Sequence, residues 1–176
     1  MSFLPFKIGA RRHTMSSATR TRVLAAQLPE VWKVIEDPYQ MPRWWPGVTR
    51  MEGVEADRFT QVFQTKRRRT VRADFRVLDS EPPGVQHSAP GHRSWTQDVA
   101  GTPFETVLQE SITEAVVEPA PEGTRVTIGQ RQRLRGYSRT GTLVVRRAAV
   151  RRLDEALDGL ERIFGKAGLR TSPRVH

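Results

Sequence analysis

Residues 138–164 carry a long helical pattern, and this pattern constrains the fold most. At 3.6 residues per turn, six apolar side chains fall on one face: Leu143, Val150, Leu153, Leu157, Leu160 and Phe164. Ser138 can cap the first turn, and Gly165 and Gly168 mark the end of the helix. An apolar stripe of this kind is stable only against a broad apolar surface, and the preceding residues have mostly strand patterns. The sequence therefore predicts a long helix packed on a sheet.

One charged residue interrupts this apolar stripe. Arg146 lies between Leu143 and Val150, where a charge is normally excluded. Either this part of the helix overhangs the sheet, or it covers a space that is not packed core. In the second case Arg146 pairs with an anionic or carbonyl group of a ligand, or with an inward acid such as Glu110. The sequence leaves these alternatives open.

Upstream of the helix, strand patterns alternate with turn signals. We expect a first strand over 18–26, a short helix over 28–36 and a second helical turn over 39–44. An irregular loop is expected over 86–92. Further strands with short links are expected over 48–54, 58–66, 68–78, 93–100, 104–118 and 124–135. Such closely spaced strands form antiparallel meanders.

Length and composition limit the classes of protein and of site. The 176 residues, 37% hydrophobic and 27% charged, predict one domain over 18–168 with a loose arm over 1–17 and a tail over 169–176. The sequence has no cysteine, which excludes disulfides, thiolate metal sites and cysteine nucleophiles. It has neither an apolar run of about 18 residues nor a secretory signal pattern, so we expect a cytoplasmic protein.

The formal net charge of +10 comes almost entirely from arginine. Clusters at 66–69 and 131–135, with Arg72 and Arg76, predict a basic outer face of the sheet. Further cations are expected on the exposed side of the helix, at Arg147, Arg151 and Arg152. Such a surface could dock on an anionic membrane or on RNA, or it could simply be solvated. Nucleic acid is the weaker partner, because interleaved exposed aromatics for base stacking are not evident.

The order of several short motifs resembles that of one superfamily. After a first strand come LPEVWKVIED at 28–37, WWPGV at 44–48, GTRVT at 123–127 and LDEALDGL at 153–160. Together they resemble the START/Bet v 1-like (SRPBCC) superfamily, in particular its bacterial polyketide cyclase/dehydrase-like branch, over residues 18–164. The resemblance rests on order and spacing, since no single motif is highly specific.

This resemblance implies the helix-grip fold. In this α+β fold a curved antiparallel sheet wraps around a long C-terminal helix, with an apolar cavity between them; here two short helices would follow the first strand. Members of the superfamily bind lipids, polyketides, hormones and other hydrophobic molecules, and some catalyse cyclisation or dehydration. The resemblance therefore predicts the fold more closely than it predicts the function.

The residues themselves also favour a cavity. Gln130 and Gln132 share a strand face with Val126, Ile128 and Leu134, and an unpaired amide under an apolar helix is unfavourable. A ligand or a trapped water would satisfy both amides; at the hydrated rim of the sheet they would need neither.

The aromatic residues supply candidates for an apolar lining. Trp44 and Trp45 cannot both face inward on a regular element, so we expect one at the cavity mouth and the other outside the sheet. The full set of candidate ligand-binding residues is Trp44, Trp45, Phe63, Phe75, Trp95, Phe104, Gln130, Gln132, Leu143, Arg146 and Val150.

Signals for catalysis and for metal binding are weak. His87 and His92 flank a probable turn at Pro90-Gly91, and two histidines alone do not make a metal site. The carboxylates on predicted strands, Asp98, Glu105 and Glu110, are more typical of a solvated strand face than of an acid or base. We expect no cofactor and no metal.

The sequence thus predicts non-covalent binding of a hydrophobic or amphipathic small molecule, such as a lipid or polyketide, by a carrier or sensor. The first alternative is a cyclase or dehydratase acting on a polyketide-like substrate in the same cavity, which rests on the resemblance alone. The second alternative is a basic module that docks on a membrane or on RNA. The oligomeric state is left open.

Overall fold

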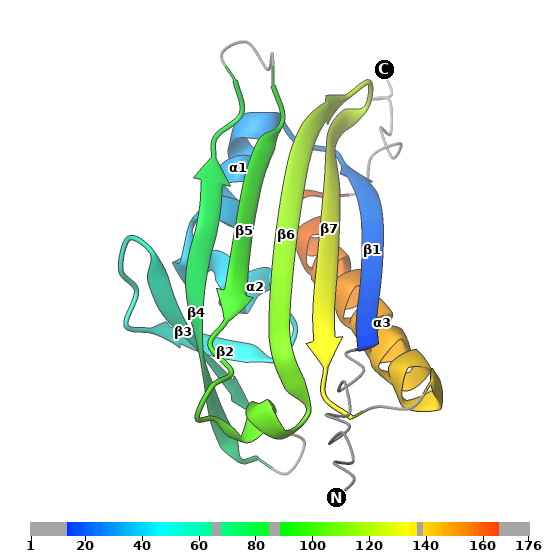
Figure 1. Ribbon diagram of the computed structural model, residues 1–176. Helices are drawn as coiled ribbons and strands as arrows, with labels where there is room; N and C mark the ends of the chain where they lie inside the picture. The colour runs from blue at the N-terminus through cyan, green and yellow to red at the C-terminus, as the bar shows by residue number, and fades with distance from the viewer. Residues whose placement is uncertain (1–13, 65–67, 85–88, 137–138, 166–176) are drawn as a thin grey trace, which may run out of the picture.

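The computed structural model describes residues 14–64, 68–84, 89–136 and 139–165 (Figure 1). The elements follow the expected order of one strand, short helices, a run of strands and one long helix. They are β1 (Thr14–Leu24), α1 (Leu28–Glu36), the 3-10 turn η1 (Pro38–Gln40), α2 (Met41–Trp44), β2 (Val48–Glu52), β3 (Arg58–Gln64), β4 (Thr70–Glu81), β5 (Gly91–Gln97), the 3-10 turn η3 (Pro103–Thr106), β6 (Leu108–Ala120), β7 (Gly123–Leu134) and α3 (Arg139–Phe164).

The strands form one seven-stranded sheet in the order β1-β7-β6-β5-β4-β3-β2, with every neighbouring pair antiparallel. The chain crosses from one edge to the other through α1 and α2, and then returns strand by strand until β7 pairs with β1 (Figure 1). Register shifts in β4 and β6 bend the sheet, because a bulged strand bends locally and twists more strongly. The predicted helix-grip fold is confirmed.

Alternation along β7 places its apolar side chains under the helices. Val126 and Ile128 are fully buried and Gln130 is 7% exposed, whereas the next residue, Arg131, is exposed. This is the two-residue period expected of a strand with one buried face.

The long helix α3 buries only part of its predicted stripe. Leu153, Leu157 and Leu160 are fully buried, whereas Leu143 is 46% exposed and Arg146 is also exposed. In Figure 1 the beginning of α3 extends past β1 at the edge of the sheet. Arg146 is therefore tolerated because this part of the helix overhangs the sheet, which was the first of the two interpretations.

The end of α3 is fixed by a glycine. Gly165 has a left-handed backbone with φ of 80°, and its N–H donates to the Glu161 carbonyl at 2.8 Å. The other predicted end signals, Ser138 and Gly168, lie outside the described residues. None of the helices in the described ranges is long and apolar enough to cross a membrane.

Several boundaries differ from the expectation, among them the starts of three strands. β1 begins at Thr14 rather than at 18, and β5 begins at Gly91, inside the expected loop over 86–92. The strand expected from 104 begins only at Leu108, because Pro103–Thr106 forms the turn η3. The Thr102 hydroxyl accepts the Phe104 N–H at 3.3 Å and caps this turn.

Trp44 and Trp45 are both buried, so the prediction that one of them covers the outside of the sheet is wrong. Trp44 is the last residue of α2, and Trp45 has an extended backbone with φ of −85° and ψ of 125°. This change of direction lets both side chains point inward, with 1% and 4% of their surfaces exposed and their rings edge to face at 5.4 Å.

The basic outer face is partly neutralised. Arg72 pairs with Glu52 at 3.0 Å, Arg76 pairs with Asp98 at 2.8 Å, and Arg135 approaches Glu105 at 3.6 Å. Residues 66 and 67 of the predicted cluster lie outside the described ranges. These ion pairs reduce the net positive field of this face, on which the docking hypothesis depends.

Candidate functional site

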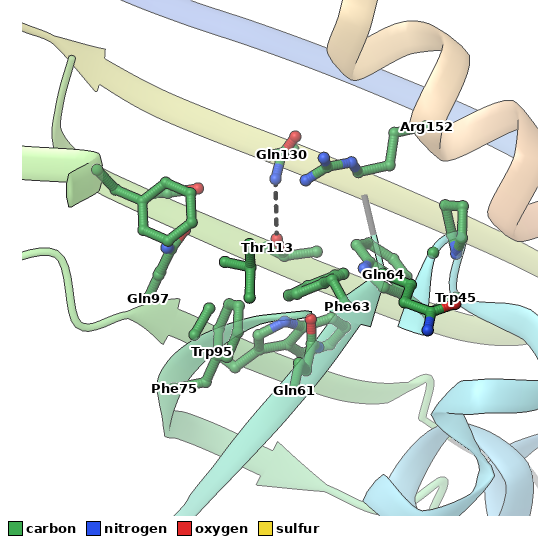
Figure 2. Close-up of a pocket in the computed structure, with 16 residues that line it drawn as sticks. Trp45, Gln61, Phe63, Gln64, Phe75, Trp95, Gln97, Thr113, Gln130 and Arg152 are labelled. Atoms are coloured by element: carbon green, nitrogen blue, oxygen red, sulfur yellow. Dashed lines mark hydrogen bonds between the residues drawn. The ribbon is translucent and has the colours of Figure 1, made fainter. Parts of the chain in front are cut away.

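A pocket of about 320 Å³ lies on the helix side of the sheet, beside the end of α2 and the middle of α3 (Figure 2). It is built by residues from five neighbouring strands, from the turn η3, from the residues after α2 and from α3. The residues that line it are Trp45, Pro46, Gly47, Gln61, Phe63, Gln64, Val71, Ala73, Phe75, Trp95, Gln97, Phe104, Ser111, Thr113, Gln130 and Arg152.

Aromatic side chains form the apolar wall of the pocket. The Trp45 and Trp95 rings meet edge to face at 5.8 Å, and Phe75 stacks on the buried Phe59 at 5.4 Å. These contacts fix the rings before any ligand arrives, so little side-chain entropy is lost when an apolar molecule binds against them.

The space exists because small side chains stand between these rings. On β4, Ala73 lies opposite Gln61 and precedes Phe75 on the same face. On β6, Ser111 and Thr113 line the same pocket, and Thr113 lies opposite Trp95 on β5. Both are nearly fully buried. A row of small residues in the sheet therefore leaves a volume that neither the helices nor the aromatic rings fill.

Four glutamines place polar atoms in this mostly apolar lining, and two of them, Gln61 and Gln130, are buried. The Gln130 Nε2 donates to the Thr113 Oγ1 at 3.5 Å across the β6–β7 pair (Figure 2). Gln61 is fully buried; its Nε2 approaches the Met41 sulfur at 3.1 Å, while its Oε1 has no hydrogen-bond partner among the described residues. An unpaired buried acceptor is unfavourable, and a ligand that donates a hydrogen bond would relieve it.

Arg152 enters the same pocket from α3, with its guanidinium directed toward Gln130 (Figure 2). The side chain is exposed, as predicted, but it lies where α3 borders the pocket, which was not predicted. Burial lowers the pKa of Arg152, and the neighbouring Glu155 opposes this effect only in part. The side chain as a whole stays exposed to solvent, so this effect of burial is only partial.

The structure brings six of the predicted site residues together around the pocket. They are Trp45, Phe63, Phe75, Trp95, Phe104 and Gln130. Their contact with a ligand remains a prediction.

The other five candidates lie outside the pocket. Leu143 and Arg146 belong to the overhanging part of α3, and Val150 packs against the core. Trp44 is buried in the core, and Gln132 lies nearer the end of β7, opposite Ser111 on β6. Arg146 forms no ion pair with Glu110 or with any other residue in the described ranges, in agreement with the interpretation that this part of α3 overhangs the sheet.

The sequence reading missed Arg152, and a second helical stripe could have revealed it. Ala149, Arg152, Ala156 and Gly159 recur at helical spacing, and the three small residues are all buried. Small side chains mark the side of a helix that approaches its neighbours most closely. A cation among them, in the part of α3 that covers the sheet, is the unusual feature.

The acids and histidines singled out in the sequence lie elsewhere. His92 Nδ1 lies 2.7 Å from Asp79 Oδ2, and Asp98 and Glu105 pair with arginines. His87 lies outside the described residues. Within the described ranges, no group of three or more histidines and carboxylates could hold a metal ion.

Comparison with known protein families gives a match over most of the chain. A family model described as polyketide cyclase/dehydrase and lipid transport matches residues 15–165. No curated protein matches the sequence.

Solved structures similar to this chain share its fold at low sequence identity. One is the di-domain ARO/CYC BexL from the BE-7585A biosynthetic pathway, with 21% identity, a TM-score of 0.66, and coverage of 83% of this chain and 45% of that chain. Another is the di-domain ARO/CYC StfQ from the steffimycin biosynthetic pathway, with 14% identity, a TM-score of 0.62, and coverage of 85% and 49%. This chain thus spans about half the length of either protein. A START superfamily protein from Mycobacterium smegmatis has 12% identity and a TM-score of 0.62, over 87% of this chain and 97% of that one.

Proposed function

Because this chain belongs to the polyketide cyclase/dehydrase and lipid transport family, we propose that it binds a hydrophobic or amphipathic small molecule non-covalently, as a carrier or sensor. The observation that carries the proposal is the pocket of about 320 Å³, walled by aromatic rings, with amide, hydroxyl and guanidinium groups placed in its mostly apolar lining. Sites for small molecules are generally of this kind: mostly apolar, with a small number of placed polar groups that orient the ligand.

The polar groups of the lining support binding more directly than they support catalysis. Among the described lining residues they are amides, hydroxyls and the Arg152 guanidinium. Amides and hydroxyls donate and accept hydrogen bonds, and a guanidinium donates only, so none of them is an effective general base near neutral pH.

The alternative is an enzyme of the cyclase or dehydrase type that uses the same pocket. The family description includes such activities, and Arg152 could stabilise negative charge that develops on a substrate carbonyl oxygen. Incubating the protein with the molecule that it retains, and following product formation by mass spectrometry, distinguishes turnover from binding.

Native mass spectrometry of the freshly purified protein tests the proposal, followed by organic extraction of whatever is bound. Ala73→Leu is the pocket-filling variant, because Ala73 is 3% exposed and lies in the wall. Ala148→Leu adds the same side chain at an exposed site on α3 and is the control.

We expect a discrete ligand on the wild type and on Ala148→Leu, and its loss from Ala73→Leu. Equal occupancy of a folded Ala73→Leu would place the ligand elsewhere and refute the pocket as the site. Wild-type protein that yields no ligand, and that binds no apolar molecule in solution, would refute the binding function.

A further inference from the structure

We propose that Arg152 anchors an anionic head group and that the ligand is an organic carboxylate with a hydrophobic body. This inference rests on the proposed function, since it assigns the chemistry of the molecule held in the same pocket. It gives Arg152 a ligand-binding role that the sequence had suggested for Arg146.

The first support is the position of the guanidinium. Arg152 reaches from α3 into the pocket, and the rings of Phe75 and Trp95 lie on the sheet side (Figure 2). A ligand in this space therefore has a charged end near α3 and an apolar end against the sheet. Such polarity fits an amphipathic anion rather than a uniformly apolar molecule.

The second support is that no protein carboxylate pairs with this guanidinium in the described part of the chain. The same helix does supply acids to other arginines: Arg20 pairs with Asp154 at 2.9 Å, and Arg22 pairs with Glu161 at 2.9 Å and with Asp158. Those pairs join α3 to β1 at the edge of the sheet. Arg152 forms no such pair, so its hydrogen-bonding capacity remains available to a ligand.

The third support is the energetic cost of this arrangement. Arginine stays charged at neutral pH even where burial lowers its pKa. A guanidinium beside an apolar wall is less well hydrated than one in bulk water, and a ligand carboxylate would compensate for the lost hydration. The guanidinium fork also matches the two oxygens of a carboxylate, which allows two parallel hydrogen bonds.

A neighbouring amide can share the head group. Gln130 lies beside the guanidinium, and its Nε2 already points into the pocket through its 3.5 Å contact with Thr113 (Figure 2). A carboxylate bound to Arg152 would thus meet a second N–H donor. The aromatic wall favours a ring or a chain as the apolar body, within a volume of about 320 Å³.

The test compares two isosteric molecules that differ in charge, para-phenylbenzoate and para-phenylbenzamide, by equilibrium dialysis against the full chain after organic extraction. We expect the wild type to bind the carboxylate about 10- to 100-fold more tightly than the amide, the range typical of hydrogen bonds to charged groups. Arg152→Met should abolish this preference and leave amide binding within about threefold of wild type. Arg146→Met, which removes an exposed arginine outside the pocket, should keep the preference.

The outcomes separate this inference from the proposed function. Equal wild-type affinities for the carboxylate and the amide would overturn the inference and leave the binding function standing. A retained preference in a folded Arg152→Met would also overturn it, because the anchor would lie elsewhere. Binding of neither molecule would overturn the inference, whereas the binding function falls only if the freshly purified protein also yields no ligand and binds no other apolar molecule. The wild-type comparison alone remains decisive if Arg152→Met does not fold.

Discussion

Replacing Gly159 with alanine tests the closest approach between α3 and the end of α2, which positions the mouth of the pocket. A Cβ at Gly159 would lie 2.4 Å from the Trp44 carbonyl oxygen and 2.6 Å from the Trp44 Cα. These are backbone atoms and cannot rotate away, so α3 must move by about 1 Å to restore ordinary van der Waals contact. The next residue, Trp45, lines the pocket and would be displaced with it.

The expected loss of stability follows from two opposing effects. Overpacking typically costs about 1–3 kcal/mol, and contact with backbone favours the upper end of that range. Alanine recovers about 1 kcal/mol through its higher helix propensity. We therefore expect Gly159→Ala to lower the free energy of unfolding by about 2 kcal/mol, which corresponds to a fall in Tm of about 4–8 °C for a chain of this size.

Urea unfolding followed by circular dichroism measures this effect. Ala148→Gly is the matched control: it makes the reverse exchange at an exposed site of the same helix and should cost about 1 kcal/mol through propensity alone. If Gly159→Ala is as stable as the wild type or more stable, the steric argument is wrong. Unchanged affinity for the extracted ligand would show that Trp45 does not depend on this contact.

Three further substitutions test other parts of the structure. Gln61→Met should raise the free energy of unfolding by about 1 kcal/mol in urea, because it removes a buried acceptor without a partner; a loss would mean that the Oε1 is satisfied. Hydrogen bonding, chiefly from Arg72, lowers the pKa of Glu52 in the folded state below its usual 4.5. The Glu52 carboxylate therefore stabilises the fold above pH 4.5, and this stabilisation is lost as the pH falls through the pKa of the folded state. An NMR titration that places the Glu52 pKa at or above 4.5 would contradict this. Arg22→Gln should cost about 0.5–1 kcal/mol at low salt and less at high salt, since its partner Asp158 is half exposed; a salt-independent loss would exclude an electrostatic cause.

The sequence by itself determined the order and type of the elements. An element with one buried and one exposed face leaves a periodic pattern in its own sequence. Val126, Ile128 and Gln130 alternate with polar residues such as Arg131 in this way. Leu153, Leu157 and Leu160 recur with the helical period. Turn residues marked most of the boundaries. One exception is the turn at Pro103–Thr106, which extends beyond the proline into the first residues of the expected strand. These features, with the order of the motifs, were enough to predict the fold and the family.

Only the tertiary structure decided which residues surround the pocket. Helical periodicity gives the angle of a side chain around α3, and by that measure Arg146 lies on the apolar stripe. It does not say where along its axis the helix leaves the sheet, and Arg146 lies beyond that point while Arg152 lies over the pocket. Likewise, the extended backbone of Trp45, directly after α2, turns its side chain inward beside that of Trp44. A pocket depends on the overlap of elements that are distant in the sequence, and no local pattern records that overlap.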